Sequence, residues 1–244
     1  LILYKKGLPE SEVSIVSPME LGGLSSPEYQ QINPQGKMPA LTTPTINLGE
    51  SDTIARYLMS TYATTGPSFQ PDNARSNLMA RFHDLYLTTI QGCLYKPSPP
   101  FGSFGTRQEA LQEFQKQLNV LEDLVVDEGL YLCGSEVSYA DATIFPTLVF
   151  CKYMMPKFQN GGTVPPKLER YFEQVRTQDA AFAKVYDEIM GVLMGSWDEG
   201  RQRWDSIWLA GQRDSDPDTI FDKIVAKEIP ATIVRETDDA IAFT

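Results

Sequence analysis

The sequence predicts an α+β protein in which a small unit of short strands and a helix precedes a larger all-helical unit. Two short apolar runs, residues 38–41 and 45–48, lie just before a helical pattern that starts at residue 51. From residue 73 onward apolar residues recur every three or four positions, as in amphipathic helices. Residues 63–72 between the units are rich in Thr, Gly, Pro and Ser, which is typical of a linker.

Composition excludes several classes of protein. With 244 residues and 42% apolar residues, the chain suits one large or two modest soluble domains. No apolar run approaches the ~20 residues of a membrane span, and we expect neither a signal peptide nor a membrane partner. A net charge of −11 argues against nucleic-acid binding. The three scattered cysteines predict free thiols in a reducing, cytoplasmic compartment, with no metal site.

The first residues predict the end of a helix and then a strand. Lys5 and Lys6 followed by Gly7 form a basic last turn and a C-terminal glycine. Residues 11–17 alternate and are rich in β-branched side chains, so we expect a strand there.

The stretch of residues 33–58 predicts a turn, a hairpin and a helix in succession. Asn-Pro-Gln-Gly at 33–36 is turn chemistry, and Thr-Thr-Pro separates the two apolar runs, with Pro44-Thr45 as the corner of the hairpin. Ser51 is the predicted N-cap of the helix, whose buried face contains Ile54, Tyr57 and Leu58. Because a helix N-terminus presents unpaired N–H groups, this corner is suited to binding a ligand carboxylate.

This order of residues resembles the glutathione-binding half of the thioredoxin-like domain in cytosolic glutathione transferases. The family pattern is Asn-Pro-x-Gly, then Lys-Val-Pro, then Glu-Ser before the helix, and Lys37-Met38-Pro39 and Glu50-Ser51 fall on its last two parts. The resemblance implies a cis Met38–Pro39 bond whose backbone groups pair with an extended peptide ligand. It also implies that Glu50 and Ser51 hold the γ-glutamyl amine and carboxylate, and that Lys37 holds the glycyl end.

The same resemblance leaves the catalytic residue unknown. Residues 1–17 correspond to the end of the family's first helix and its second strand. The family's first strand, which precedes the Tyr, Ser or Cys that activates the glutathione thiol, then has no counterpart in this sequence. Tyr4 falls near the end of the helix, where we expect a buried packing role.

Two long amphipathic helices are predicted to open the helical unit as an antiparallel pair. One has an apolar stripe at Leu78, Phe82 and Leu85, and residues 96–106, rich in Pro and Gly, separate it from the second. The second stripe has 3–4 spacing and consists of Leu111, Phe114, Leu118, Leu121 and Val125. The single histidine, His83, lies in the first helix and is expected to be a packing or surface residue.

A capping box is predicted at Ser138 and Asp141, which are three residues apart. The same residues match the Ser-x-x-Asp-Ala box of the glutathione transferase C-terminal domain, at the start of its buried central helix. We assign them a role in folding and not in catalysis.

The last residues contain two further features. Trp197, Trp204 and Trp208 predict a tail helix that packs on the preceding domain, with a partner-binding surface as the alternative. Residues 219–244 resemble the opening of a histidine-triad (HIT) nucleotide-binding domain, which starts Ile-Phe-x-Lys-Ile, reaches a Pro and ends its strands in Ala-Phe. The His-x-His-x-His element of that family is not in this sequence.

The resemblances together imply a domain order and a function. Residues 1–62 form a partial thioredoxin-like domain, 73–186 an all-α helical-bundle domain, 187–218 a Trp-rich tail and linker, and 219–244 a short α/β fragment that starts a HIT-like domain. The implied function is that of a homodimeric glutathione transferase, with glutathione as co-substrate and a small electrophile as second substrate. One alternative is a non-catalytic binding or scaffold module. Another is a nucleotide hydrolase or transferase whose HIT domain is completed in a longer product.

Overall fold

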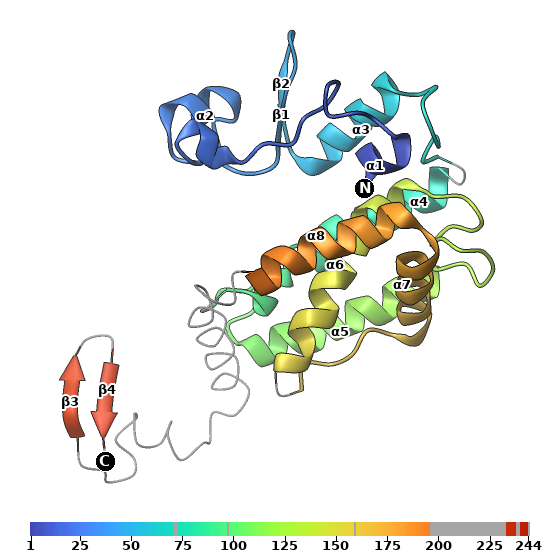
Figure 1. Ribbon diagram of the computed structural model, residues 1–244. Helices are drawn as coiled ribbons and strands as arrows, with labels where there is room; N and C mark the ends of the chain where they lie inside the picture. Colours follow the sequence, from blue (N-terminus) through green and yellow to red (C-terminus); the bar gives the residue numbers. More distant parts are fainter. Residues whose placement is uncertain (71–72, 97, 159, 196–232, 238–239, 244) are drawn as a thin grey trace.

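The computed structural model has a small N-terminal domain on one end of a larger helical domain (Figure 1). It describes residues 1–70, 73–96, 98–158, 160–195, 233–237 and 240–243. Helices α1 (Ile2–Lys6) and α3 (Ser51–Thr61) lie on the side of the N-terminal domain that faces the helical domain. None of the described helices is both long and apolar enough to cross a membrane.

Helix α1 ends where the sequence predicts. Gly7 is the C-cap and has a φ of 64°, a left-handed conformation that glycine adopts without strain. The Lys6 ammonium is buried and donates to three linker carbonyls, so the linker is held against the end of α1. These carbonyls belong to Tyr62, Thr65 and Pro67, at 2.7, 3.0 and 3.1 Å.

The predicted strand at residues 11–17 is wrong. The chain turns there instead, with the N–H groups of Glu12 and Val13 both donating to the Pro9 carbonyl at 2.9 and 3.1 Å. Ile15 and Val16 are exposed at 71% and 60%. A strand requires a hydrogen-bonded neighbour, and in the described part of the chain no strand pairs with this segment. Two short helices follow, η1 (Pro18–Leu21) and α2 (Pro27–Ile32).

The predicted hairpin forms, with shorter strands. β1 (Ala40–Thr42) and β2 (Asn47–Gly49) pair antiparallel, and the hairpin projects away from the helical domain (Figure 1). The Thr43 hydroxyl closes the corner by accepting from the Ile46 N–H at 3.0 Å. Pro39 has no N–H to donate to the ladder, and the N–H groups of Thr45 and Ile46 donate to the Thr43 hydroxyl in the turn, so each strand is shorter than its apolar run.

Helix α3 begins one residue earlier than the predicted N-cap implies. The N-cap is Glu50 and not Ser51, because the chain turns into the helix at Glu50, which has φ 63° and ψ 123°. The Glu50 side chain makes no capping hydrogen bond. Leu58 and Met59 are the buried residues of the helix.

The helical domain is built around α6 (Tyr139–Met154), which is apolar on nearly all sides and packs against α4 and α8 (Figure 1). The break between the first two long helices is present, since α5 starts after residue 106. The remaining elements are α4 (Asn73–Phe82), η2 (His83–Leu87), η3 (Gln91–Leu94), α5 (Arg107–Leu124), η4 (Met155–Lys157), α7 (Pro166–Gln178) and α8 (Ala180–Gly195).

The first predicted helical stripe is wrong at two of its three residues, since Phe82 packs against the core but Leu78 and Leu85 face outward. Leu78 and Leu85 are exposed at 53% and 45%, whereas Met79 and Leu87 are fully buried. The helical path also changes to a π-helix at η2, which alters the spacing of its faces. His83 is a buried packing residue, and its Nε2 lies 2.7 Å from the Thr147 hydroxyl.

The predicted pairing of Ser138 with Asp141 is present at the start of α6. The buried Asp141 carboxylate accepts from the Ser138 N–H at 2.8 Å, the Ser138 hydroxyl at 2.6 Å and the Leu132 N–H at 3.0 Å. Burial raises the pKa of Asp141 against these hydrogen bonds. The box therefore holds both the start of α6 and the loop before it.

The C-terminal backbone forms a second hairpin. β3 (Ile233–Thr237) pairs antiparallel with β4 (Ala240–Phe243). Residues 219–232, which carry the first half of the HIT resemblance, lie outside the described residues, as do Trp197, Trp204 and Trp208. The HIT-like fragment and the packed Trp tail therefore stay predictions.

Candidate functional site

The hairpin register brings the two predicted binding segments together. Ala40 pairs with Gly49, so Pro39 and Glu50 flank the last pair of the ladder. Partners across an antiparallel ladder lie about 5 Å apart at their Cα atoms. Lys37–Pro39 and Glu50–Ser51 thus meet where β2 runs into α3 (Figure 1). All five side chains are exposed.

The backbone of Lys37 is fixed by two side chains that sequence reasoning did not single out. Its carbonyl accepts from the Tyr29 hydroxyl and from Asn33 Nδ2, each at 2.8 Å. Both side chains are buried, and Asn33 Oδ1 also accepts from the Gln35 N–H at 3.2 Å. The Asn-Pro-Gln-Gly turn therefore fixes the position of the Lys37 backbone beside the predicted site. Asn33 as the first turn residue is the signal that points to this role.

The backbone conformation of residues 36–39 depends on Gly36 and on the peptide bond after Met38. Gly36 has a φ of 60°, and a Cβ there would lie 2.9 Å from the Leu24 carbonyl oxygen, so glycine is required. The Met38–Pro39 peptide bond is cis, as predicted. The Met38 side chain is 63% exposed.

Glu50 holds an unusual backbone conformation at the start of α3. A φ of 63° is disfavoured for a residue with a Cβ, and such strain is concentrated at binding and catalytic sites. It turns the chain so that the first N–H groups of α3 follow directly after an exposed glutamate and an exposed serine. This arrangement offers hydrogen-bond donors and a hydroxyl to an anionic group, and a carboxylate to a cationic one.

A polar cluster lies behind the start of α3. The Asp52 carboxylate accepts from the Tyr139 hydroxyl at 2.6 Å and from Arg56 Nε at 3.0 Å. Burial opposes ionisation of Asp52, but the hydrogen bonds from Arg56 and Tyr139 prevail and lower its pKa. Tyr139 belongs to α6, so this contact joins the two domains. Its residues are 87 positions apart, and no sequence pattern pairs them.

Two further polar contacts join α1 to the helical domain. Lys5 forms an ion pair of 2.6 Å with Asp179, which also accepts from the Tyr131 hydroxyl at 2.8 Å. The Tyr4 hydroxyl donates to Glu188 at 2.6 Å, and this hydrogen bond raises the pKa of Tyr4 to about 12. Tyr4 packs against the core as expected, but it is half-buried and not buried, and its hydroxyl is engaged.

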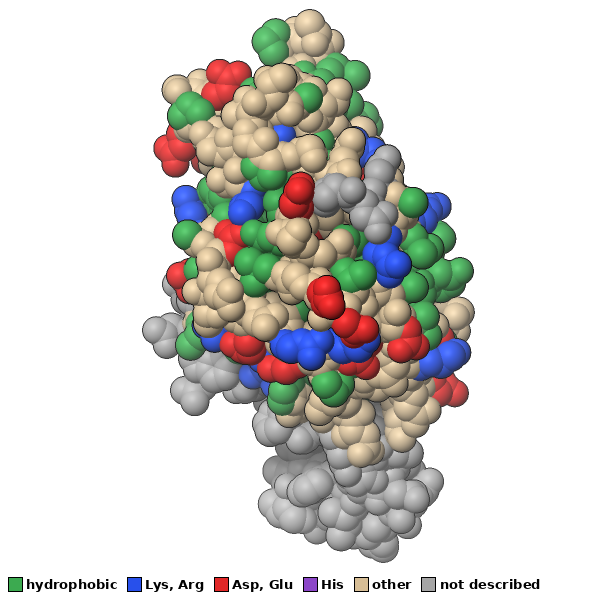
Figure 2. All heavy atoms as spheres, turned by 90° about the vertical axis from the view of Figure 1, so that its right-hand side faces the viewer, with side chains coloured by type: hydrophobic (Ala, Val, Ile, Leu, Met, Phe, Trp, Pro, Cys, Tyr) green, Lys and Arg blue, Asp and Glu red, His purple; other side chains and the backbone are tan. Residues whose placement is uncertain are grey.

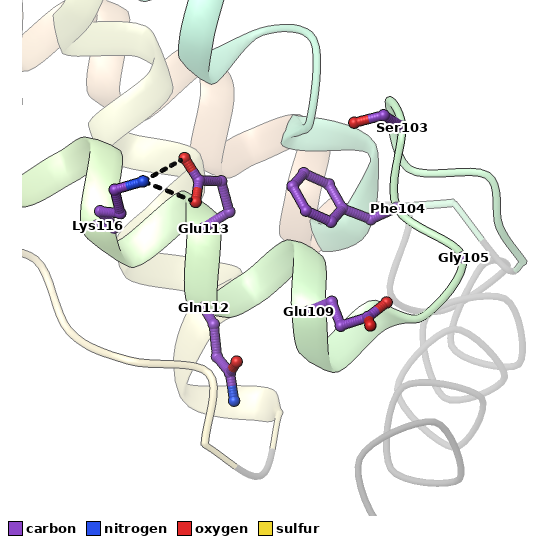
Figure 3. Close-up of a pocket in the computed structure, with 7 residues that line it drawn as sticks. All are labelled: Ser103, Phe104, Gly105, Glu109, Gln112, Glu113 and Lys116. Carbon is purple, nitrogen blue, oxygen red and sulfur yellow. Dashed lines mark hydrogen bonds and ion pairs between the residues drawn. The ribbon is translucent and has the colours of Figure 1, made fainter.

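A recess of about 470 Å³ lies on a different part of the molecule (Figure 3). It is open, and it sits at the start of α5 away from all five predicted ligand-binding residues. Its charged groups are engaged locally: Lys116 pairs with Glu113 at 3.2 Å, and Glu109 accepts from the Thr106 hydroxyl at 2.9 Å. Its lining consists of Ser103, Phe104, Gly105, Glu109, Gln112, Glu113 and Lys116.

The surface charge and the cysteine thiols do not indicate a second site in the described part of the chain. Acidic and basic side chains are interspersed on the face shown in Figure 2, with no large basic patch. Burial raises the pKa of the Cys93 thiol to about 12 and also raises that of Cys151, so both remain protonated at neutral pH. Among the described residues, no group of three or more His, Cys, Asp or Glu is placed to hold a metal ion.

Comparison with known proteins matches both domains to one family. The model of the glutathione S-transferase N-terminal domain matches residues 1–68, and that of the C-terminal domain matches residues 105–174. The glutathione S-transferase-like protein gedE of Aspergillus terreus is 28% identical over 156 residues, 58% of this chain and 67% of the relative. Glutathione S-transferase 1 of Ascaris suum is 25% identical over 156 residues, 62% and 73% of the two chains.

Among solved structures, poplar glutathione transferase F1 superposes with a TM-score of 0.60. The sequence identity is 22%, and the superposition covers 78% of this chain and 90% of the poplar chain. At that identity the likeness shows a shared fold.

Proposed function

Since the chain belongs to the glutathione S-transferase family, with both domains of that family matched, we propose that it binds glutathione and transfers the thiolate to a small electrophile. The observation that carries the binding step is the meeting of Lys37–Pro39 with Glu50–Ser51 at the start of α3. These residues offer groups of both charges to an extended peptide.

Glutathione matches this set of groups in charge and order. Its γ-glutamyl carboxylate would bind Ser51 and the N–H groups of α3, and its α-ammonium would bind the Glu50 carboxylate. The cysteinyl backbone would pair with the Met38 backbone beside Pro39, as a peptide pairs with a sheet edge. Lys37 would hold the glycyl carboxylate.

The proposed reaction is a nucleophilic transfer. The thiolate sulfur of bound glutathione forms a bond to an electrophilic carbon, and the leaving group departs with its bonding electron pair. The thiol proton is released beforehand to a base. The helical domain is proposed to supply the surface that the electrophile contacts.

Retention on glutathione-agarose tests the binding step. We expect the wild-type chain to be retained and to elute with free glutathione, and Glu50→Ala to weaken binding by about tenfold, because the ligand ammonium loses its partner. Glu136→Ala is the control, since Glu136 is an exposed glutamate of the helical domain outside the site. A wild-type chain that washes through would refute the proposal.

Turnover is tested separately from binding. The rate of conjugation of glutathione to an activated chloroarene, with the non-enzymatic rate subtracted, should be saturable in both substrates. A chain that binds glutathione with no rate above background would instead be the non-catalytic binding module.

We also propose that the protein is a cytoplasmic homodimer with its domain boundary in residues 63–72. An exposed apolar row on α4 and η2, formed by Leu78, Leu85 and Tyr86, supports pairing of two copies. Light scattering of the purified protein should give twice the chain mass, and a monomer would contradict the pairing.

The matched stretches end at residue 174, so they lend no support to nucleotide chemistry at 219–244.

A further inference from the structure

We infer that Tyr139, in the first turn of α6, is a positioning residue for the glutathione site. Its hydroxyl bonds to Asp52, the residue that follows Ser51 in the first turn of α3. Tyr139 lies in the helical domain, whereas the ligand groups lie in the N-terminal domain. The inference rests on the proposed function and assigns one contact between the domains a role in ligand affinity.

Tyr139 is a fixed point of the helical domain. Its side chain is only 5% exposed, and its N–H donates to the Phe69 carbonyl at 2.9 Å. The preceding residue, Ser138, is bonded twice to Asp141, and the N–H of Ala140 donates to the buried Ser76 hydroxyl at 3.0 Å. The backbone on both sides of Tyr139 is therefore held, and its hydroxyl has a defined place.

Asp52 receives this hydroxyl together with an arginine. Asp52 Oδ1 accepts from Tyr139 at 2.6 Å, and both carboxylate oxygens lie 3.0 Å from Arg56 Nε. The Arg56 guanidinium lies 5.0 Å from the centre of the Tyr139 ring. The three side chains contact one another, so that the charge of Asp52 is compensated and its direction is set. Arg56 Nη2 also donates to Asn77 Oδ1 in α4 at 3.2 Å.

The cluster matters for ligand binding because it holds the first turn of α3, which is proposed to bind glutathione. The buried residues of α3, Leu58 and Met59, lie in its second half. The first turn follows Glu50, whose backbone is strained, and Asp52 is its direct bond to the helical domain. Donors that are already oriented bind more tightly than donors that must be ordered on binding. Loss of the Tyr139 hydroxyl should therefore weaken glutathione binding without unfolding the protein.

Tyr4 provides a matched control. Its hydroxyl also donates to a carboxylate across the domain interface, from α1 to Glu188 in α8, and at the same distance of 2.6 Å. Tyr4→Phe and Tyr139→Phe each remove one hydroxyl from one tyrosine–carboxylate contact between the domains. The two contacts differ in whether the partner carboxylate adjoins the predicted ligand site, and the Tyr4 contact is the more exposed of the two.

Isothermal titration with reduced glutathione tests the inference. We expect Tyr139→Phe to raise the Kd by about fivefold and Tyr4→Phe to leave it within about twofold of wild type, since each substitution removes a hydrogen bond to a charged group and only that of Tyr139 adjoins the predicted ligand site. Thermal melts should show small and similar losses for both variants. An unchanged Kd for Tyr139→Phe, or an equal rise for Tyr4→Phe, would overturn the inference.

A double-mutant cycle identifies the route of the effect. Asp52→Ala, and Asp52→Ala combined with Tyr139→Phe, should raise the Kd to the same extent as each other, because the hydroxyl acts through Asp52. Additive losses would overturn that route. If wild type itself binds no glutathione, the proposed function fails; if wild type binds and Tyr139→Phe binds equally well, the positioning role alone fails.

Discussion

The starts of α3 and α6 each contain a serine and an acid, but these side chains are used in different ways. At α6, Ser138 and Asp141 are both fully buried, and they satisfy each other's groups and the Leu132 N–H. At α3, Glu50 and Ser51 are exposed, and the N-cap side chain makes no hydrogen bond. A satisfied helix start stabilises a fold, whereas an open one leaves its donors available to a ligand. The capping box is thus assigned to stability and the open start to binding.

The largest expected effect is at Asp141. Asp141→Ala should lower the free energy of unfolding by about 3 kcal/mol, because three donors lose their buried acceptor. Urea denaturation measures this loss. At a temperature where the variant is folded, its glutathione affinity should match wild type, and a selective loss of affinity would contradict the assignment of this start to stability.

Ser138→Ala should cost less, about 1 kcal/mol, since it removes one capping hydroxyl and leaves Asp141 bonded to two backbone N–H groups. A thermal melt of the variant measures the shift. A melting temperature equal to that of wild type would refute the assignment.

Glu50→Gly should separate stability from binding. Glycine adopts a positive φ without strain, so the variant should gain up to about 0.5 kcal/mol, while the ligand ammonium loses its carboxylate partner. Urea denaturation and glutathione titration on the same sample are the measurements. Loss of stability with unchanged affinity would reverse the assignment of this residue.

The smallest effect is a pH dependence at Asp52. The pKa of Asp52 is lowered from the usual 3.8. Its contribution to the free energy of unfolding is therefore present above pH 3.8 and is lost as the pH falls through the lower, folded-state pKa. The difference in unfolding free energy between wild type and Asp52→Asn should therefore shrink from pH 5 toward pH 2. The difference stays below about 0.5 kcal/mol because the carboxylate is partly exposed. The raised pKa of Asp141 predicts the opposite pH dependence. Its contribution to the free energy of unfolding should be largest below pH 3.8 and should decline as the pH rises through the folded-state pKa.

Features decided by neighbours in the chain followed from the sequence alone. The end of α1 at Gly7, the hairpin of β1 and β2, the break before α5 and the pairing of Ser138 with Asp141 all depend on groups within a few residues of one another. The order of Lys37–Pro39 and Glu50–Ser51 likewise implied a shared site, because a short hairpin joins them.

Features decided by distant contacts did not follow. Residues 11–17 have strand composition but no pairing strand among the described residues, and Leu78 has helical spacing but faces outward. Spacing fixes the period of a helix and leaves open which face is buried, since that depends on the partner. The bond from Tyr139 to Asp52 spans 87 residues. The sequence determined the local turns, the capping box of α6 and the order of residues on which the proposed site rests. Only tertiary packing decided which faces are buried and which residue of the helical domain contacts the start of α3, because those features depend on groups far apart in the chain.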